Sequence, residues 1–296
     1  MKLVFAALEQ LRPKQWAKNV LLFAALIFSS EFLSLEMVGR TVLGFVAFSM
    51  VSSAGYVLND LLDREADRRH PKKRRRPIAS GRLPIPVAIV LFAVVAALGV
   101  ALSLQISVAF FALTMFYLAT TMSYSYYFKH VVILDVMLLA TGFVWRALAG
   151  AAAIEVTVSP WFFACTAFLA LFLGFNKRYA ELRQVGAEAG TRKTLDAYTL
   201  RMLEHFQMTV TSGVILTYTL YTVMGTERWM AVTAPIVLYG VFRWVYLVEQ
   251  RGEGAAPEDT LFRDRPLLVT VALYGLAVVV ILTSHALGML PGMRPW

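Results

Sequence analysis

The chain has little of what a water-soluble enzyme uses. Only 16% of its 296 residues are charged, 58% are hydrophobic, and the mean hydropathy is +0.64. A soluble domain of this length could not cover so much apolar surface, so the composition predicts one integral membrane domain over residues 1–296. The single cysteine, Cys165, excludes an intrachain disulfide, and the isolated His205 and His285 predict neither a zinc site nor a catalytic triad.

Other signals are also missing. The first sixteen residues contain no apolar segment followed by a small-residue cleavage site, so we expect no removable signal peptide. Despite the net charge of +9, no aromatic-basic pattern supports a nucleic-acid partner. An inverted repeat with broken helices, which would indicate a transporter of phosphorylated anions, is not evident either. The stretch 251–259 (RGEGAAPED) is the only one that resembles a linker.

Long apolar windows set the expected architecture. Segments of roughly 17 to 22 mostly apolar residues match the length that crosses a bilayer. Pro84, Pro160 and Pro266 stand at or just before three of them, where a helix tolerates proline. The pattern predicts an all-α protein with nine transmembrane helices near residues 18–34, 40–58, 84–103, 106–126, 131–152, 160–176, 204–223, 230–249 and 267–287.

The basic residues predict the orientation of these spans. If the N-terminus is cytoplasmic, all but five of the 28 Lys and Arg fall in cytoplasmic segments. The exceptions are Arg40, Arg228 and Arg294 outside, and Arg146 and Arg243 within spans. The positive-inside rule therefore predicts a cytoplasmic N-terminus and an external C-terminus, which an even number of spans would spoil. We expect a multi-pass protein of the bacterial inner membrane.

The stretch 59–81 (NDLLDREADRRHPKKRRRPIASG) follows the second expected span directly. On one continuous helix, five side chains would share about a quarter of the circumference: Tyr56, Asn59, Asp60, Asp63 and Asp67. Clustered carboxylates repel one another unless a cation lies between them, and oxygen ligands favour Mg²⁺. The pattern predicts a magnesium site, with a solvated helix end paired to Arg64 and Arg68 as the alternative.

A basic loop follows, in which Lys72 to Arg76 are all cationic. Pro77 and Gly81 indicate a shaped turn. In such a turn Arg76 and Ser80 could donate hydrogen bonds to phosphate oxygens. A signal for membrane topology alone is the alternative, although it would not need the sequence PIASG. The candidate phosphate-binding residues of this loop are Lys73, Arg74, Arg76 and Ser80.

Further charged groups lie near the same expected membrane face. Lys177, Arg178 and Glu181 fall on one side of a helix after the sixth span, where a juxtamembrane anchor is the alternative. Asp135 lies one turn into the fifth span, and an ion inside a membrane usually faces a bundle interior or a wet cavity. For Arg146, deeper in that span, a substrate contact and a structural role are equally open. The remaining candidates are Lys14, Lys18, Tyr126 and Lys129.

These motifs together resemble the UbiA superfamily of intramembrane prenyltransferases. The match rests on Asn59-Asp60-x-x-Asp63-x-x-x-Asp67, the loop that ends Arg76-Pro77-x-x-Ser80-Gly81, and the nine expected spans. The resemblance implies a helical bundle around a central cavity, whose first motif holds Mg²⁺ and a substrate diphosphate at the cytoplasmic mouth. A lateral opening would admit an isoprenoid tail.

One departure indicates a branch of that superfamily. Typical members carry a second aspartate-rich DxxxD motif after about the sixth helix, whereas this chain has Asn176, Lys177, Arg178 and Glu181 there. The strings RPKQWAKN, HPKKRRRPIASG, LDVMLLATGFVWRALAGA and KRYAEL are similar to the decaprenyl-phosphate phosphoribosyltransferase branch. That branch transfers 5-phosphoribose from phosphoribosyl pyrophosphate (PRPP) to a polyprenyl phosphate, for cell-wall arabinan.

The resemblance implies roles for the candidate residues. Asn59, Asp63 and Asp67 would ligate Mg²⁺ with Asp60 in support, while Asp135 would stabilise positive charge on the ribose. Lys177 and Arg178, oriented by Glu181, would bind the 5-phosphate or the acceptor phosphate. An ordinary prenyltransferase that joins a prenyl diphosphate to an aromatic or lipid acceptor is the alternative activity. The sequence leaves a monomer and a homo-oligomer equally open.

Overall fold

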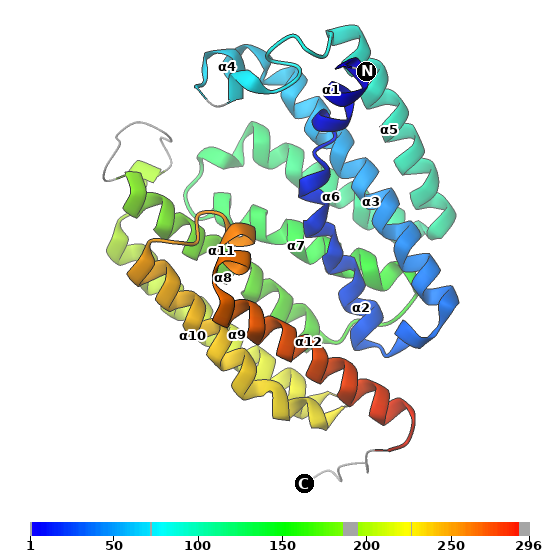
Figure 1. The fold of residues 1–296 in the computed structure, drawn as a ribbon, viewed down its shortest axis with the longest axis vertical. Coiled ribbons are helices and arrows are strands. Elements are labelled where there is room, and N and C mark those ends of the chain that lie inside the picture. The colour runs from blue at the N-terminus through cyan, green and yellow to red at the C-terminus, as the bar shows by residue number, and fades with distance from the viewer. Residues whose placement is uncertain (1, 72, 186–194, 226, 290–296) are drawn as a thin grey trace. The chain divides into compact units, whose positions relative to one another are not determined.

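A computed structural model describes residues 2–71, 73–185, 195–225 and 227–289 of the chain. In that part every regular element is a helix (Figure 1). The chain divides into two compact units, Met1–Tyr126 with Trp145–Thr157, and Tyr127–Val144 with Val158–Trp296. The boundary falls inside helix α7 (Leu134–Ala153), so each unit is described separately.

Unit 1 is built around α3 (Leu35–Leu62), which packs along α5 (Ile85–Ile106). Ser34 caps α3 by accepting a hydrogen bond from the Met37 amide (3.4 Å), and Pro84 precedes α5 as expected. The core of the unit includes Phe48, Phe110 and Tyr117. Its other elements are α1 (Lys2–Gln10), η1 (Pro13–Leu22), α2 (Phe23–Phe28), η2 (Glu31–Leu33), α4 (Arg64–Arg69), η3 (Lys73–Arg75), α6 (Val108–Tyr126) and the second half of α7.

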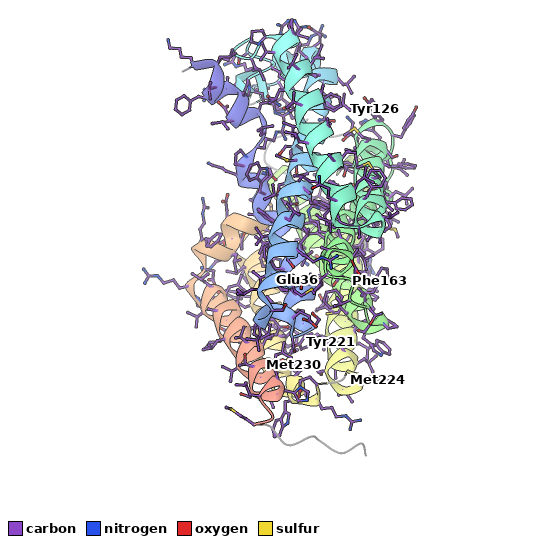
Figure 2. All side chains as sticks on the ribbon, turned by 90° about the vertical axis from the view of Figure 1, so that its right-hand side faces the viewer. Glu36, Tyr126, Phe163, Tyr221, Met224 and Met230 are labelled. Carbon is purple, nitrogen blue, oxygen red and sulfur yellow. The ribbon has the colours of Figure 1, made fainter. Side chains whose placement is uncertain are left out.

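Unit 2 is centred on α8 (Pro160–Val185) and α9 (Leu200–Met224), which pack along each other. Their interface holds a buried polar pair, in which the Gln207 amide donates to Asn176 Oδ1 (2.9 Å). The helix α9, which carries Tyr221 and Met224 near its end, packs against η6, which carries Met230 (Figure 2). The other elements are η4 (Phe128–His130), η5 (Leu195–Ala197), η6 (Arg228–Thr233), α10 (Ala234–Arg251), α11 (Pro257–Arg263), α12 (Arg265–Ala286) and the first half of α7.

Seven helices in the described part are long and apolar enough to cross a membrane. They are Leu35–Leu62, Ile85–Ile106, Val108–Tyr126, Leu134–Ala153, Pro160–Gln184, Arg228–Arg251 and Arg265–Ala286. Each matches one of the nine expected windows. The window at 204–223 forms the long helix α9, but its threonine, serine and glutamine residues keep it out of the seven.

The window at 18–34 differs more, because it is not one α-helix. The chain forms η1, α2 and η2 in succession, starting at Pro13, which has no amide hydrogen to donate. At the junction of η1 and α2, Gly150 of α7 touches the backbone of Leu22 so closely that an added Cβ would lie 2.0 Å from the Leu22 carbonyl oxygen. This contact lets two backbones meet where a side chain would separate them.

Replacing Gly150 by alanine is therefore expected to destabilise unit 1 by about 1 to 3 kcal/mol, since backbone must move to admit the methyl group. Thermal unfolding in detergent would measure the change. Gly39 of α3 is the matched control, because nothing lies within 4 Å of its added Cβ. Gly39→Ala should be neutral or stabilising, since alanine favours a helix by about 1 kcal/mol over glycine. Equal effects of the two substitutions would contradict this packing.

Asp264 forms the link between α11 and α12 in unit 2. It caps α12 through the Leu267 amide (2.9 Å), and Arg243 donates two hydrogen bonds to its carboxylate (3.1 and 2.7 Å). The hydrogen bonds from Arg243 hold the pKa of Asp264 below its ordinary value. A carboxylate of this kind stabilises the fold above its unfolded pKa, and the contribution disappears as the pH falls through the folded pKa.

We therefore expect wild type and Asp264→Asn to differ in thermal stability at neutral pH. The difference should begin to shrink below about pH 4, the ordinary range of an aspartate pKa, and disappear only below the lowered folded pKa of Asp264. Melting curves between pH 7 and pH 3 would measure this. A difference that stays constant across that range would show that the charge of Asp264 is not responsible.

Candidate active site

The predicted acidic motif lies where α3 ends. The expected continuous helix through Asp67 is interrupted, because α3 stops at Leu62 and α4 begins at Arg64. Asp63 is the residue between them, and its amide still bonds to the Asn59 carbonyl oxygen (2.9 Å). The expected single helix is therefore interrupted at Asp63, although the Asp67 amide still bonds to the Asp63 carbonyl oxygen (2.8 Å). The side chains of the motif sort into two groups.

Asp60 is the centre of the first group. Its side chain is 1% exposed and accepts hydrogen bonds from three residues. Gln10 donates to Oδ2 (2.8 Å), Arg12 Nη2 donates to both oxygens (2.7 Å each), and Arg76 Nη1 donates to Oδ1 (2.9 Å). The carboxylate is thus neutralised by two arginines from either side of it in the sequence.

Asp67 joins the same group through Arg76. The Arg76 Nη1 atom that binds Asp60 also lies 2.6 Å from Asp67 Oδ2, and Lys73 Nζ lies 3.8 Å from Asp67 Oδ1. The cation that bridges these two carboxylates is consequently a guanidinium. The alternative pairing to Arg64 and Arg68 is not what the structure has, because both arginines contact Glu65.

Asn59 and Asp63 form the second group. Asn59 Nδ2 donates to Asp63 Oδ2 (3.3 Å), so the amide and carboxylate lie side by side, and both are partly exposed. Among the described residues, no three His, Cys, Asp or Glu side chains are close enough to hold a metal. Mg²⁺ usually takes one or two carboxylates and completes its shell with water and substrate phosphate. The oxygens of Asn59 and Asp63 fit such an ion, whereas Asp67 is engaged by Arg76.

The basic loop is folded as the sequence indicates. Gly81 has a φ of 78°, which forms the expected turn. The hydroxyl of Ser80 donates to the Pro77 carbonyl (3.3 Å), and Arg74 is exposed. Lys72 lies outside the described residues. Arg82 ties the loop to α1 by donating to both oxygens of Glu9 (2.7 and 2.9 Å), and these bonds lower the pKa of Glu9.

Unit 2 has a charged cluster of its own. Asp135, in the first turn of α7, accepts from Arg178 Nε (2.9 Å) and from the Tyr198 hydroxyl (2.7 Å). Arg178 Nη1 also donates to Glu181 (2.5 Å). Asp135 and Arg178 are buried, and burial together with the Asp135 bond raises the pKa of Tyr198. The exposed cation of this cluster is Lys177, with Nζ 4.0 Å from Glu181.

Arg146 belongs to a third network, deeper in unit 1. Its Nε donates to Asn19 (2.8 Å) and its Nη2 to the Tyr117 hydroxyl (3.0 Å). The guanidinium also lies 4.6 Å from the centre of the Tyr117 ring and 5.6 Å from that of Phe48. These buried hydrogen bonds fit the structural alternative for Arg146, and the substrate contact stays a prediction.

The other candidates are more dispersed. Lys14 is exposed and Lys18 is half-buried, both on η1, and Lys129 is half-buried in η4. Tyr126 is 51% exposed at the end of α6 (Figure 2). Tyr56 lies under the Arg12 guanidinium, 5.0 Å from ring centre to Cζ.

Sequence reasoning missed three residues of these clusters: Gln10, Arg12 and Tyr198. Gln10 is one turn from the buried Ala6 of α1, so the spacing of a buried face could have found it. Arg12 precedes Pro13 and lies six residues before the first apolar window. Tyr198 lies in a segment without periodicity, and nothing local indicates its bond to a residue 63 positions away.

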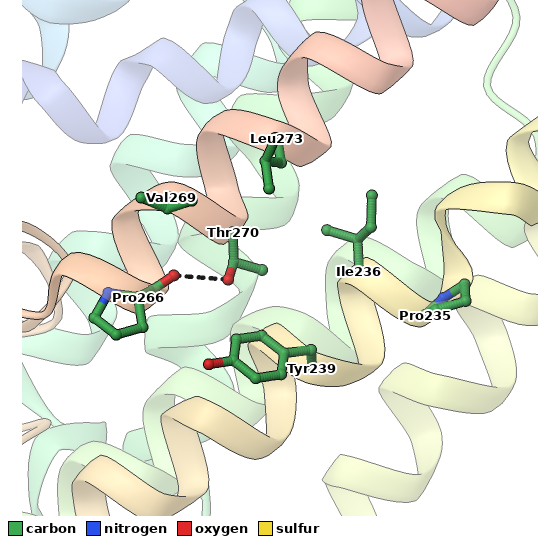
Figure 3. Close-up of a pocket in the computed structure, with 7 residues that line it drawn as sticks. All are labelled: Pro235, Ile236, Tyr239, Pro266, Val269, Thr270 and Leu273. Atoms are coloured by element: carbon green, nitrogen blue, oxygen red, sulfur yellow. Dashed lines mark hydrogen bonds between the residues drawn. The ribbon is translucent and has the colours of Figure 1, made fainter.

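A cavity of about 480 Å³ lies elsewhere, between α10 and α12 of unit 2 (Figure 3). Its wall is mainly apolar, and the Thr270 hydroxyl within it is bonded to the Pro266 carbonyl (2.7 Å). It contains none of the charged residues described above. The charged clusters, and not this cavity, therefore stay the candidate site.

The fold and these clusters define a class: a multi-pass, all-helical membrane protein with carboxylates and cations gathered at helix ends. The model of the UbiA prenyltransferase family matches residues 20–263, and the chain belongs to that family.

Among its relatives, the decaprenyl-phosphate phosphoribosyltransferase of Corynebacterium glutamicum is 32% identical, over 92% of this chain and 85% of that protein. The enzyme of the same name from Mycobacterium tuberculosis H37Rv is 32% identical, over 93% and 95% respectively. A solved UbiA homolog from Archaeoglobus fulgidus, bound to GPP and Mg²⁺, shares the fold with a TM-score of 0.71 at 20% identity, covering 94% of this chain and 99% of that one.

Proposed function

We propose that this protein transfers 5-phosphoribose from PRPP to a polyprenyl phosphate and releases pyrophosphate. The observation that carries the proposal is the 32% identity, over nearly the full length, to enzymes named decaprenyl-phosphate phosphoribosyltransferase. The product would be a lipid-linked phosphoribose that supplies cell-wall arabinan.

The donor diphosphate is assigned to unit 1. Asn59 and Asp63 offer oxygen ligands to Mg²⁺, and Asp67 would join them when a substrate anion draws Arg76 away from its carboxylate. The bound ion would withdraw charge from the leaving pyrophosphate. Lys73, Arg74 and Arg76 would bind the same anion directly, because a guanidinium can donate two parallel hydrogen bonds to phosphate. Ser80 supplies a hydroxyl beside them.

A second anion is assigned to unit 2. Lys177 is the accessible cation there, 39% exposed, and would bind the 5-phosphate or the acceptor phosphate. Arg178 is held between Asp135 and Glu181, so it fixes their positions. A carboxylate such as Asp135 can stabilise the positive charge that develops at the ribose C1 atom. The other predicted substrate contacts stay predictions: Lys14, Lys18, Tyr56, Tyr126, Lys129 and Arg146.

The proposed reaction needs little proton transfer. The C1–O bond to pyrophosphate breaks, and an oxygen of the acceptor phosphate forms the new bond to C1 while pyrophosphate takes the electron pair. A phosphate monoester has a second pKa near 6, so the acceptor is largely ionised at neutral pH. Catalysis therefore rests on position and charge, not on a general base.

The topology is proposed on the charge pattern. We infer that the chain crosses the membrane nine times and that its N-terminus lies in the cytoplasm. The nine crossings are the seven apolar helices, α9, and the segment formed by η1 and α2. The family and the seven helices support a place in the bacterial inner membrane, with the charged loops on the cytoplasmic side.

The alternative is transfer of a prenyl group from prenyl diphosphate to an aromatic or lipid acceptor, as the family description suggests. Purified protein should be incubated with either pair of substrates, with and without chelator. The proposal expects chelator-sensitive label from PRPP in the lipid phase and no prenylated acceptor. The opposite result would establish the alternative.

A further inference from the structure

Two arginines from distant segments share one buried carboxylate in unit 1. Arg12 lies 48 residues before Asp60, and Arg76 lies 16 residues after it. Both guanidinium groups bind the same atom, Asp60 Oδ1, at 2.7 and 2.9 Å. Two guanidinium cations that approach one oxygen atom this closely would repel each other if that oxygen did not carry negative charge. Asp60 is therefore what allows Arg12 and Arg76 to be neighbours.

The hydrogen-bonding capacity of Asp60 is fully used by these contacts. Each carboxylate oxygen receives two donors: Arg12 and Arg76 at Oδ1, and Gln10 and Arg12 at Oδ2. A carboxylate has about four lone-pair sites, so none is left for a metal ion or a substrate. This contrasts with Asp63, whose one side-chain hydrogen bond in the described part comes from Asn59.

The arginines, in contrast, have donors to spare. Arg12 binds Asp60 through Nη2, and Arg76 binds both aspartates through Nη1. Within the described residues, the other guanidinium nitrogens of these two side chains have no acceptor. Both side chains are 27% exposed, so an anion from solution can reach them. With Lys73, the two arginines place three positive charges next to the two negative charges of Asp60 and Asp67.

The N-terminal segment is built to hold Arg12 in this place. Arg12 has a φ of 53°, in the left-handed region that a non-glycine residue rarely occupies. Its guanidinium Cζ lies 5.0 Å from the centre of the Tyr56 ring, and Gln10, which is 1% exposed, donates to the same Asp60 carboxylate. Strained residues that the surroundings hold in this way are typical of binding sites.

We propose that Arg12 and Arg76 form an anion clamp, and that Asp60 is the positioning residue which holds its two halves together. The ligand of the clamp is a diphosphate, because two adjacent guanidinium groups match two linked phosphates. This rests on the proposed function only for the identity of the substrate, PRPP. The clamp itself requires a diphosphate from either donor.

The first test measures binding without turnover. Thermal unfolding of the purified full-length protein is followed with increasing inorganic pyrophosphate, at fixed free Mg²⁺. We expect Arg12→Gln, Arg76→Gln and Asp60→Asn each to weaken pyrophosphate binding by about ten- to a hundredfold, the effect of losing a charge-assisted hydrogen bond. The control is Glu155→Gln, which alters an exposed ion pair with Arg40 and should bind as wild type does.

The second test separates positioning from metal binding. Asp60→Asn should raise the KM for PRPP by about tenfold or more, while the free Mg²⁺ that gives half-maximal rate stays within about twofold of wild type. A metal ligand would instead shift the Mg²⁺ requirement, and that result would overturn the assignment of Asp60.

If Asp60→Asn does not fold, Arg12→Gln carries the test alone, and unchanged pyrophosphate binding by that variant would refute the clamp. Failure of the proposed function is distinguishable. Wild type would then turn over prenyl diphosphate instead of PRPP, while the loss of pyrophosphate binding in the variants would persist.

Discussion

Replacing Asp63 by asparagine is expected to lower Mg²⁺-dependent turnover by about a hundredfold or more, because the metal supplies several kcal/mol of charge stabilisation to the leaving group. The fold should survive, since the one side-chain hydrogen bond of Asp63 in the described part is that from Asn59, at 3.3 Å. Initial rates at saturating substrates, measured across free Mg²⁺ concentrations, would show the loss. Added Mg²⁺ should restore part of it.

Glu65→Gln is the matched control for this prediction. Glu65 lies two residues away, is 68% exposed, and pairs with Arg64 and Arg68. Removing its charge should leave the rate within about twofold of wild type, because its partners Arg64 and Arg68 are not among the proposed metal or substrate ligands. An Asp63→Asn protein that folds normally and keeps full activity would remove Asp63 from the metal site.

Replacing Asp135 by asparagine should destabilise unit 2 by about 3 kcal/mol. Removing one partner of a buried ion pair costs roughly 3 to 5 kcal/mol. The lower end applies because Arg178 keeps its contact with Glu181. The Tyr198 hydroxyl would also lose the charge of its acceptor. Denaturation in mixed detergent, monitored by tryptophan fluorescence, would measure the change.

Two further variants calibrate this result. Tyr198→Phe removes the hydroxyl that binds Asp135 and receives the Ile133 amide (2.6 Å), so a loss of about 1 kcal/mol or slightly more is expected. Glu155→Gln breaks the exposed pair with Arg40 and should cost less than about 1 kcal/mol. If Asp135→Asn is no more harmful than Glu155→Gln, the Asp135–Arg178 pair does not stabilise the unit.

The sequence predicts helices well wherever apolar length decides the outcome. A run such as 85–106 has few ways to satisfy its backbone in a membrane other than as a helix. The prediction fails at 18–34, where the close approach of Gly150 to Leu22 accompanies a chain of short helices. Apolar content does not distinguish a straight helix from a broken one, because both bury the same side chains.

For the candidate site, the sequence predicts which residues are present but not which of them bind one another. The spacing of Asn59, Asp60, Asp63 and Asp67 identifies the acidic residues, but it cannot reveal that Arg76 lies between two of them. Gln10 donates to Asp60 across 50 residues, a pairing that follows from how α1 packs in unit 1. Local periodicity does not encode such pairings. The distinction between Asp60, whose oxygens are fully bonded, and Asp63, which is partly free, therefore needed the structure.

The most direct test of the proposed activity follows two labels in one reaction. The purified protein is given polyprenyl phosphate and PRPP labelled in the ribose carbon and in the β-phosphate of the diphosphate. We expect the ribose label to enter the lipid phase and the β-phosphate label to remain in water as pyrophosphate, and chelator to abolish both changes. Ribose label that stays in the aqueous phase, while prenyl diphosphate is consumed in a parallel reaction, would contradict the account.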